Sequence, residues 1–154
     1  MSGESLIAGK APRDLSGSQS YNRFEYQKHW AILLILASYE AGKDFVILLD
    51  YQDDIARTNS EDAPTSCEFY QVKTKETGNW TIASLLSRAG GAKQSILGKL
   101  GVHRATFGDL ASKSYLVSNV PLNATLQDGN PASKLEEIEL GRLGHDERSQ
   151  IVGV

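Results

Sequence analysis

The feature that most constrains the fold is the segment EFYQVKTK (68–75), which has the alternating pattern and the residue types of a β-strand. Because strand side chains point alternately to two faces, Gln71 and Lys73 lie on the same face as Phe69. Burying a glutamine and a lysine in an apolar sheet costs free energy unless a partner compensates them. The segment therefore predicts a sheet in which a neighbouring strand supplies polar partners.

An acidic cluster lies one strand earlier and offers those partners. A buried strand is predicted over 44–49 (DFVILL) and a second short strand over 54–57. The acids of the cluster are Asp50, Asp53 and Asp54. They can face Lys73 directly or through a bound cation.

The remaining pattern alternates helices and strands. A helix is predicted over 23–41, ended by Gly42, and its largely apolar second half is expected to lie deep against the sheet. Residues 58–66 are typical of a loop. Further elements are predicted as helices over 80–88 and 93–101, a strand over 113–117 and a weaker strand over 137–140. This order indicates an α/β fold with a central mixed β-sheet flanked by helices.

Length and composition limit the classes of protein. The chain has 154 residues, of which 40% are hydrophobic and 23% charged, as expected for one globular domain. Cys67 is the single cysteine, which excludes an internal disulfide framework and suits a reducing cytoplasm. The longest apolar run, 30–37, is too short to cross a membrane. Residues 1–22 are predicted to be a flexible arm and 23–154 one domain, a piece of a longer protein.

The charges are unevenly distributed around a net charge of −3. Residues 44–72 carry seven acids and one base, whereas residues 73–104 carry six bases and one acid. Such blocks fit a metal-holding centre beside a phosphate-attracting surface, and they also fit two ordinary solvated faces.

Asp54, Gln71 and Lys73 together have the chemistry of phosphodiester hydrolysis. A carboxylate and an amide carbonyl are oxygen ligands for a hard divalent cation, and a lysine beside them can position water and stabilise negative charge. Spacing alone leaves two alternatives open. One is an Asp–Lys ion pair that joins two strands of a non-enzyme, and the other is a magnesium site of a different enzyme, such as a phosphatase, built on Asp50 and Asp53.

Five motifs in order resemble one nuclease family. They are FEYQKHWA (24–31), LDYQDDI (49–55), FYQVKTK (69–75), NWTIASLL (79–86) and YLVSN (115–119). The set is similar to the N-terminal endonuclease domain of bacterial antiphage effectors, such as those of CBASS that join it to a SAVED sensor domain. That domain is a Gln-x-Lys variant of the PD-(D/E)xK superfamily, so the resemblance implies a restriction-endonuclease-like fold.

The resemblance also assigns roles to individual residues. Asp54, Gln71 and Lys73 match the catalytic positions, with Asp54 and Gln71 as ligands of Mg²⁺ or Mn²⁺. Asp50 matches a further acid that binds or orients metal, and Gln27 matches a helix residue that reaches or caps the site. Gln71 replaces the usual carboxylate, which removes one negative charge and implies weaker metal binding.

The implied function is a magnesium-dependent endodeoxyribonuclease of an antiphage effector, cutting double-stranded DNA with little sequence specificity. The expected phosphate contacts are Lys75, Arg88, Lys93, Lys99 and Arg104. The expected setting is a cytoplasmic homo-oligomer or larger defence assembly, without a membrane, whose sensor domain lies outside this chain. The alternative is a catalytically silent module for assembly, in which Asp54, Gln71 and Lys73 need not converge.

The histidines carry less information. His29 is predicted to be structural, because a lone histidine on a helix is seldom a ligand. His103 and His145 are predicted to be surface residues.

Overall fold

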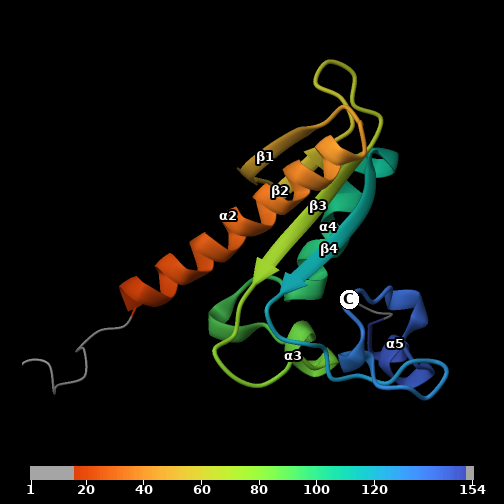
Figure 1. Cartoon of the computed structure of the whole chain (residues 1–154). Helices are drawn as coiled ribbons and strands as arrows, with labels where there is room; N and C mark the ends of the chain where they lie inside the picture. Colours follow the sequence, from red (N-terminus) through yellow and green to blue (C-terminus); the bar gives the residue numbers. More distant parts are fainter. Residues whose placement is uncertain (1–15, 152–154) are drawn as a thin grey trace, which may run out of the picture.

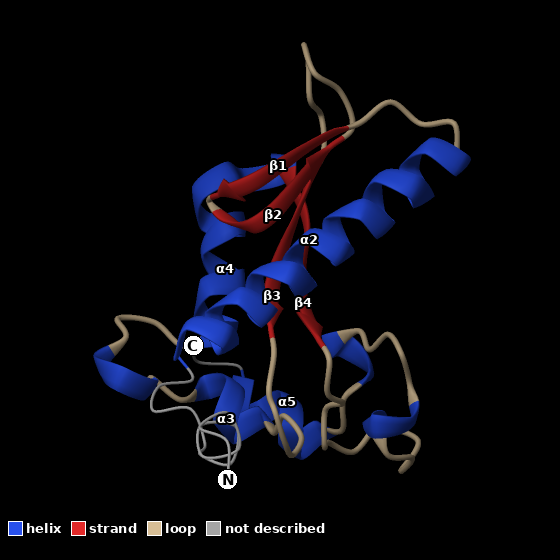
Figure 2. Ribbon diagram, turned by 60° about the vertical axis from the view of Figure 1, so that its left-hand side comes forward, coloured by secondary structure: helices blue, strands red, loops and turns tan. Residues whose placement is uncertain are grey.

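The computed structural model describes residues 16–151 of the chain. A four-stranded sheet forms the centre, with a helix on each face and the C-terminal segment packed beyond one end of the strands (Figures 1 and 2). Residues 1–15 of the predicted arm lie outside the described part of the chain. Residues 16–22 already belong to the first helix, α2 (Ser16–Glu40), which therefore begins earlier than predicted.

Helix α2 packs on the sheet through one stripe of its surface. Ala31 and Ser38 are each 4% exposed, and Leu34 packs against the same core. The prediction that its second half lies deep is wrong, because one face of a sheet covers only one side of a helix. The exposed apolar residues of that half are Ile32, Leu33, Ile35, Leu36 and Tyr39.

The sheet is mixed, as predicted. Its strands are β1 (Val46–Tyr51), β2 (Asp53–Thr58), β3 (Cys67–Lys73) and β4 (Ala111–Ser118), in the spatial order β1-β2-β3-β4. The first two pairings are antiparallel and β3 pairs with β4 in parallel. A parallel pair needs a long crossover, and this one contains α3 (Ile82–Leu86) and α4 (Ile96–Phe107).

Strand alternation produces two cores, one on each side of the sheet. Ile55, Tyr70 and Val72 face α2. Ala56 and Phe69 face the other way and pack with Phe107 of α4. The predicted fold class, a mixed sheet flanked by helices, is confirmed.

Helix α4 continues well beyond its predicted end at residue 101. The helix passes through Gly101 and ends at Phe107, and the cap residue after it is Gly108, which has a positive φ of 57°. The extension adds Phe107 to the core and places His103 on the side that faces the sheet.

The C-terminal segment forms a third cluster with α3 and the short helix α5 (His145–Ile151). Leu143 is fully buried there and Leu126 is 4% exposed. The prediction of a weak strand over 137–140 is wrong. Ile138 packs into this cluster without joining a strand, and a 3₁₀ turn begins at Leu140.

Among the residues that the structure describes, no helix has the length and apolarity required to cross a membrane.

Candidate active site

The β1–β2 hairpin is tight, because Gln52 alone separates the two strands. Asp50 and Gln52 have φ angles of 53° and 61°, which residues other than glycine seldom adopt. The turn delivers Asp53 and Asp54 to the start of β2, beside the end of β3.

The Asp54 carboxylate is the centre of the site. Its Oδ2 accepts hydrogen bonds from Gln71 Nε2 at 2.6 Å and from the Val72 backbone N–H at 2.6 Å. Lys73 Nζ lies 3.3 Å from the same oxygen. The structure thus brings Asp54, Gln71 and Lys73 together, as their spacing on neighbouring strands predicted.

Gln71 and Lys73 occupy different environments around Asp54. Gln71 is 4% exposed and lies on the sheet face that α4 covers. The Lys73 side chain is 31% exposed and also donates to the Val72 carbonyl, at 3.1 Å. The Lys73 side chain is therefore more accessible to solvent than the buried carboxamide of Gln71.

Asp50 lies apart from this centre and is held by α2. Gln27 Nε2 donates to Asp50 Oδ1 at 3.1 Å and to the Asp54 backbone carbonyl at 2.7 Å. Gln27 therefore reaches the site through the backbone carbonyl of Asp54. Asp50 does not line the cavity that Asp54 lines.

A cavity of about 340 Å³ opens between the sheet and α4. Its lining residues are Gln52, Asp53, Asp54, Gln71, Gln94, Lys99, Val102, His103, Thr106 and Phe107. The prediction that His103 is a surface residue is wrong, since it is 4% exposed in this cavity wall. Its ring stacks on Phe69 with 4.1 Å between centroids.

Asp53 was grouped with its neighbours by sequence, but its surroundings differ. Its side chain is 5% exposed, and Oδ1 accepts the Asp54 N–H at 2.9 Å. Among the described residues, Oδ2 has no hydrogen-bond partner and lies 3.4 Å from His103 Nε2. Burial raises the pKa of Asp53 above its ordinary value, and the hydrogen bond from Asp54 opposes that shift.

The residues predicted to contact phosphates lie in different environments, some exposed and some already paired. Lys99 is exposed and lines the cavity, while Arg88 and Lys93 are exposed before α4. Lys75 lies over the Trp80 ring, 4.0 Å from its centroid, and donates to the Asn79 carbonyl. Arg104 is paired with the exposed Asp109 at 2.6 Å.

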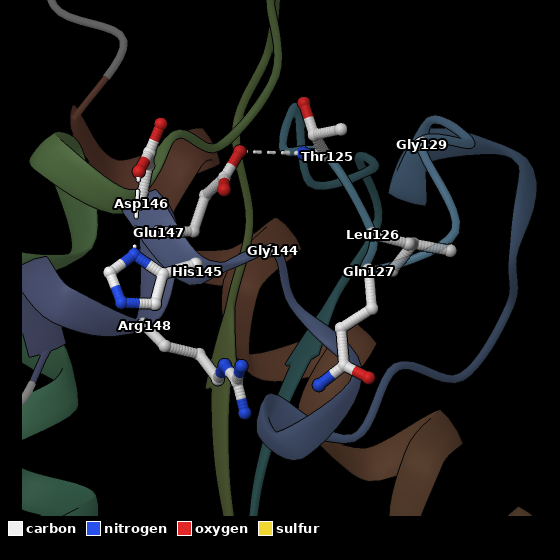
Figure 3. Close-up of a pocket in the computed structure, with 9 residues that line it drawn as sticks. All are labelled: Thr125, Leu126, Gln127, Gly129, Gly144, His145, Asp146, Glu147 and Arg148. Atoms are coloured by element: carbon white, nitrogen blue, oxygen red, sulfur yellow. Dashed lines mark hydrogen bonds and ion pairs between the residues drawn. The ribbon is translucent and has the colours of Figure 1, made fainter.

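A second cavity, of about 520 Å³, lies in the C-terminal segment (Figure 3). Glu147 spans it and accepts the Thr125 backbone N–H at 2.8 Å, and this hydrogen bond lowers the pKa of the Glu147 carboxyl. His145 and Asp146 are almost fully exposed on its rim. Glu147 joins two parts of the segment, whereas the predicted site residues Asp54 and Gln71 line the first cavity, which is therefore the candidate active site.

The oxygen atoms of Asp54 and its neighbours are suitable ligands for a hard cation. Within residues 16–151, no group of three or more His, Cys, Asp or Glu side chains is arranged to hold a metal ion. Mg²⁺ commonly uses one or two carboxylates and completes its shell with water and phosphate oxygens. Asp54 and the amide oxygen of Gln71 are of this type, and Asp53, whose Oδ2 has no hydrogen bond among the described residues, lines the same cavity. The residues therefore fit a magnesium-type ion that binds together with a phosphate.

The sequence profile of the Cap4 dsDNA endonuclease domain matches residues 15–151, which include the site and all of the described residues. No match was found among curated proteins or among solved structures.

Proposed function

The chain belongs to the Cap4 dsDNA endonuclease domain family, and from this premise we propose that Asp54, Gln71 and Lys73 form a cation-dependent centre that hydrolyses double-stranded DNA. The observation that carries the proposal is the convergence of Gln71 Nε2 and Lys73 Nζ on Asp54 Oδ2 at the cavity. A module used only for assembly has no need of this convergence.

Each residue has a distinct task in the proposed hydrolysis. Asp54 and the Gln71 amide oxygen would hold Mg²⁺ or Mn²⁺, which polarises a phosphate and lowers the pKa of a bound water. Lys73 holds a positive charge where the attacking water and the developing negative charge meet. Asp54 in turn orients the Lys73 ammonium and the Gln71 carboxamide through one oxygen.

The substrate is proposed to be duplex DNA, bound mainly through its phosphates and with little sequence preference. The exposed bases Lys99, Lys93 and Arg88 support phosphate contacts, which position a duplex without reading its bases. We further propose that the domain acts in the cytoplasm within an antiphage effector, gated by oligomerisation or by a sensor domain.

Plasmid cleavage tests this function directly. The purified chain is incubated with supercoiled plasmid in Mg²⁺, in Mn²⁺ and in EDTA, and nicked and linear products are measured. Cleavage in either cation and none in EDTA is expected. Cleavage that persists in EDTA, or that Asp54→Asn leaves unchanged, would contradict a cation-dependent centre at Asp54.

Gln71→Glu tests the proposed ligand position. The substitution places a second carboxylate against Asp54, so the two repel each other or share a proton in EDTA, and the melting temperature falls. An added divalent cation gains a charged ligand, and we expect its affinity to rise about tenfold by calorimetry.

Gln94→Glu is the matched control, since Gln94 is exposed and lines the same cavity. It adds the same charge away from Asp54 and is expected to change cation affinity little. Equal effects of the two substitutions would mean that Gln71 is not a ligand.

Salt dependence separates free bases from paired ones. Removing one phosphate contact lowers the magnitude of the slope of log K against log[salt] by about 0.9 on duplex DNA. Lys99→Ala is expected to show this loss, and Arg104→Ala a smaller one because Asp109 already pairs with Arg104. Titrations with unrelated duplexes at several salt concentrations measure both slopes, and an unchanged slope for Lys99→Ala would remove it from the DNA interface.

A further inference from the structure

His103 is buried against the candidate active site, yet the proposed hydrolysis gives it no task. It projects from α4 toward the sheet, is 4% exposed, and stacks almost parallel on Phe69, with 9° between the rings. Both ring nitrogens meet polar groups. Nδ1 lies 3.1 Å from Ser114 Oγ on β4, and Nε2 lies 3.4 Å from Asp53 Oδ2 on β2.

The chemistry of these partners indicates which ring nitrogen carries the hydrogen. When Asp53 is ionised its carboxylate only accepts, so a nitrogen that donates to it carries hydrogen. Nδ1 can then accept from the Ser114 hydroxyl, which has a proton to donate. The arrangement predicts the tautomer of His103 with hydrogen on Nε2, in a chain that runs from Ser114 through His103 to Asp53.

Asp53 connects this chain to the reacting centre. Its Oδ1 accepts the backbone N–H of Asp54, so the position of Asp53 sets where β2 begins and where the Asp54 carboxylate points. Its Oδ2 has no hydrogen-bond partner among the described residues, and the side chain is 5% exposed. The ring nitrogen Nε2 of His103 faces that oxygen from 3.4 Å.

The hairpin before Asp53 needs such an anchor. Asp50 and Gln52 hold positive φ angles, which cost free energy when nothing else favours them. A strained turn keeps one geometry only when its surroundings hold it in place. Gln27 holds the turn from the α2 side, through Asp50 and the Asp54 carbonyl.

We propose that His103 is a positioning residue of the nuclease site, which holds Asp53 from the α4 side and thereby fixes the Asp54 carboxylate for catalysis. Catalytic hydrogen bonds are often long before substrate binds, and a separation of 3.4 Å is compatible with such a contact. This inference rests on the proposed function of Asp54, and it adds a residue that the Gln-x-Lys motif does not contain.

Two substitutions of His103 separate positioning from packing. His103→Phe keeps a ring to stack on Phe69 and removes both nitrogens, whereas His103→Gln gives up the ring and keeps a donor near the Nε2 position. We expect His103→Phe to lower kcat by about 10- to 100-fold, with KM for DNA little changed, as for other residues that orient a metal ligand. His103→Gln is expected to recover most of that loss.

Thermal unfolding of the same variants provides the comparison. Positioning predicts that the rates do not follow the melting temperatures, since His103→Gln has lost the stacked ring. Rates that fall in step with stability, or a His103→Phe variant that cleaves like wild type, would overturn the inference. His145→Phe is the matched control, because the His145 side chain is 89% exposed and lies outside the cavity.

A readout independent of cleavage keeps the test decisive if His103→Phe fails to fold. In the ¹⁵N spectrum of histidine side chains, His103 is expected to be protonated on Nε2. Asp53→Asn should shift the His103 resonances and leave those of His29 and His145 in place. If the His103 resonances do not respond, the contact is absent and the inference is wrong.

The two proposals fail in different ways. A wild-type chain that does not cleave DNA with any divalent cation would contradict the nuclease function, and with it the catalytic meaning of His103. A wild-type chain that cleaves, and that loses cleavage on Lys73→Ala but not on His103→Phe, would contradict only the role of His103.

Discussion

In plasmid cleavage with Mg²⁺, Lys73→Ala is expected to lower the rate by about 10²- to 10³-fold, the loss typical of removing one group that stabilises developing charge. DNA affinity is expected to fall only modestly. Lys73 Nζ lies 3.3 Å from Asp54 Oδ2, so in the proposed mechanism its charge acts at the reacting phosphate more than on the bound duplex.

Lys93→Ala is the matched control, because Lys93 is exposed on the connection before α4. Its loss should weaken binding about equally for unrelated duplexes and leave the rate at saturating DNA unchanged. Binding titrations paired with single-turnover cleavage measure both quantities. If Lys73→Ala loses affinity and rate in the same proportion, Lys73 is a phosphate anchor and its catalytic role is wrong.

Phe69→Ala is expected to have the largest effect on stability, a loss of about 3–5 kcal/mol in the free energy of unfolding. Phe69 is 1% exposed and stacks on His103 and on Phe107, with 5.2 Å between the two phenyl centroids. Typical domains are stable by only about 5–15 kcal/mol, so part of the population would unfold. Urea unfolding followed by circular dichroism measures the change.

Phe24→Ala makes the same chemical change on α2, where Phe24 is 49% exposed. Its cost should stay below about 1 kcal/mol, including the contact of Lys28 with the ring. Similar costs at the two positions would mean that Phe69 does not support the sheet face behind the site.

The sheet and the convergence of its polar residues could be predicted because they depend on local pattern. Alternation in 68–75 places Gln71 and Lys73, and an acid one strand earlier is the natural partner in an antiparallel pair. Alternation alone does not decide which of Asp50, Asp53 and Asp54 fills that place, and the choice of Asp54 came from the family resemblance. The positive φ angles of Asp50 and Gln52 reset the alternation, so Asp50 turns toward Gln27 while Asp54 faces β3.

His103 was missed because α4 was predicted to end at Gly101. A glycine in a helix costs only about 1 kcal/mol, and packing against the sheet outweighs that cost here. The spacing of Leu97, His103 and Phe107 held the information, since these residues fall on one side of a helix that continues to 107. The exposed side of α2 was not predicted, because a run of apolar residues does not indicate whether one side of a helix or both sides will be covered.

The parallel pairing of β3 with β4 has a consequence for the order of folding. It joins residues about 45 positions apart, whereas β1, β2 and β3 pair through short connections. Closing the longer loop costs more chain entropy, so β2 and β3 can pair, with Asp54 against Gln71, before β4 docks. His103 arrives only with the crossover, and Ser114 only with β4. During synthesis the site is therefore complete only after residues 111–118 have left the ribosome. Asp54 and Gln71 can meet before that point, but the support from His103 and Ser114 reaches them later.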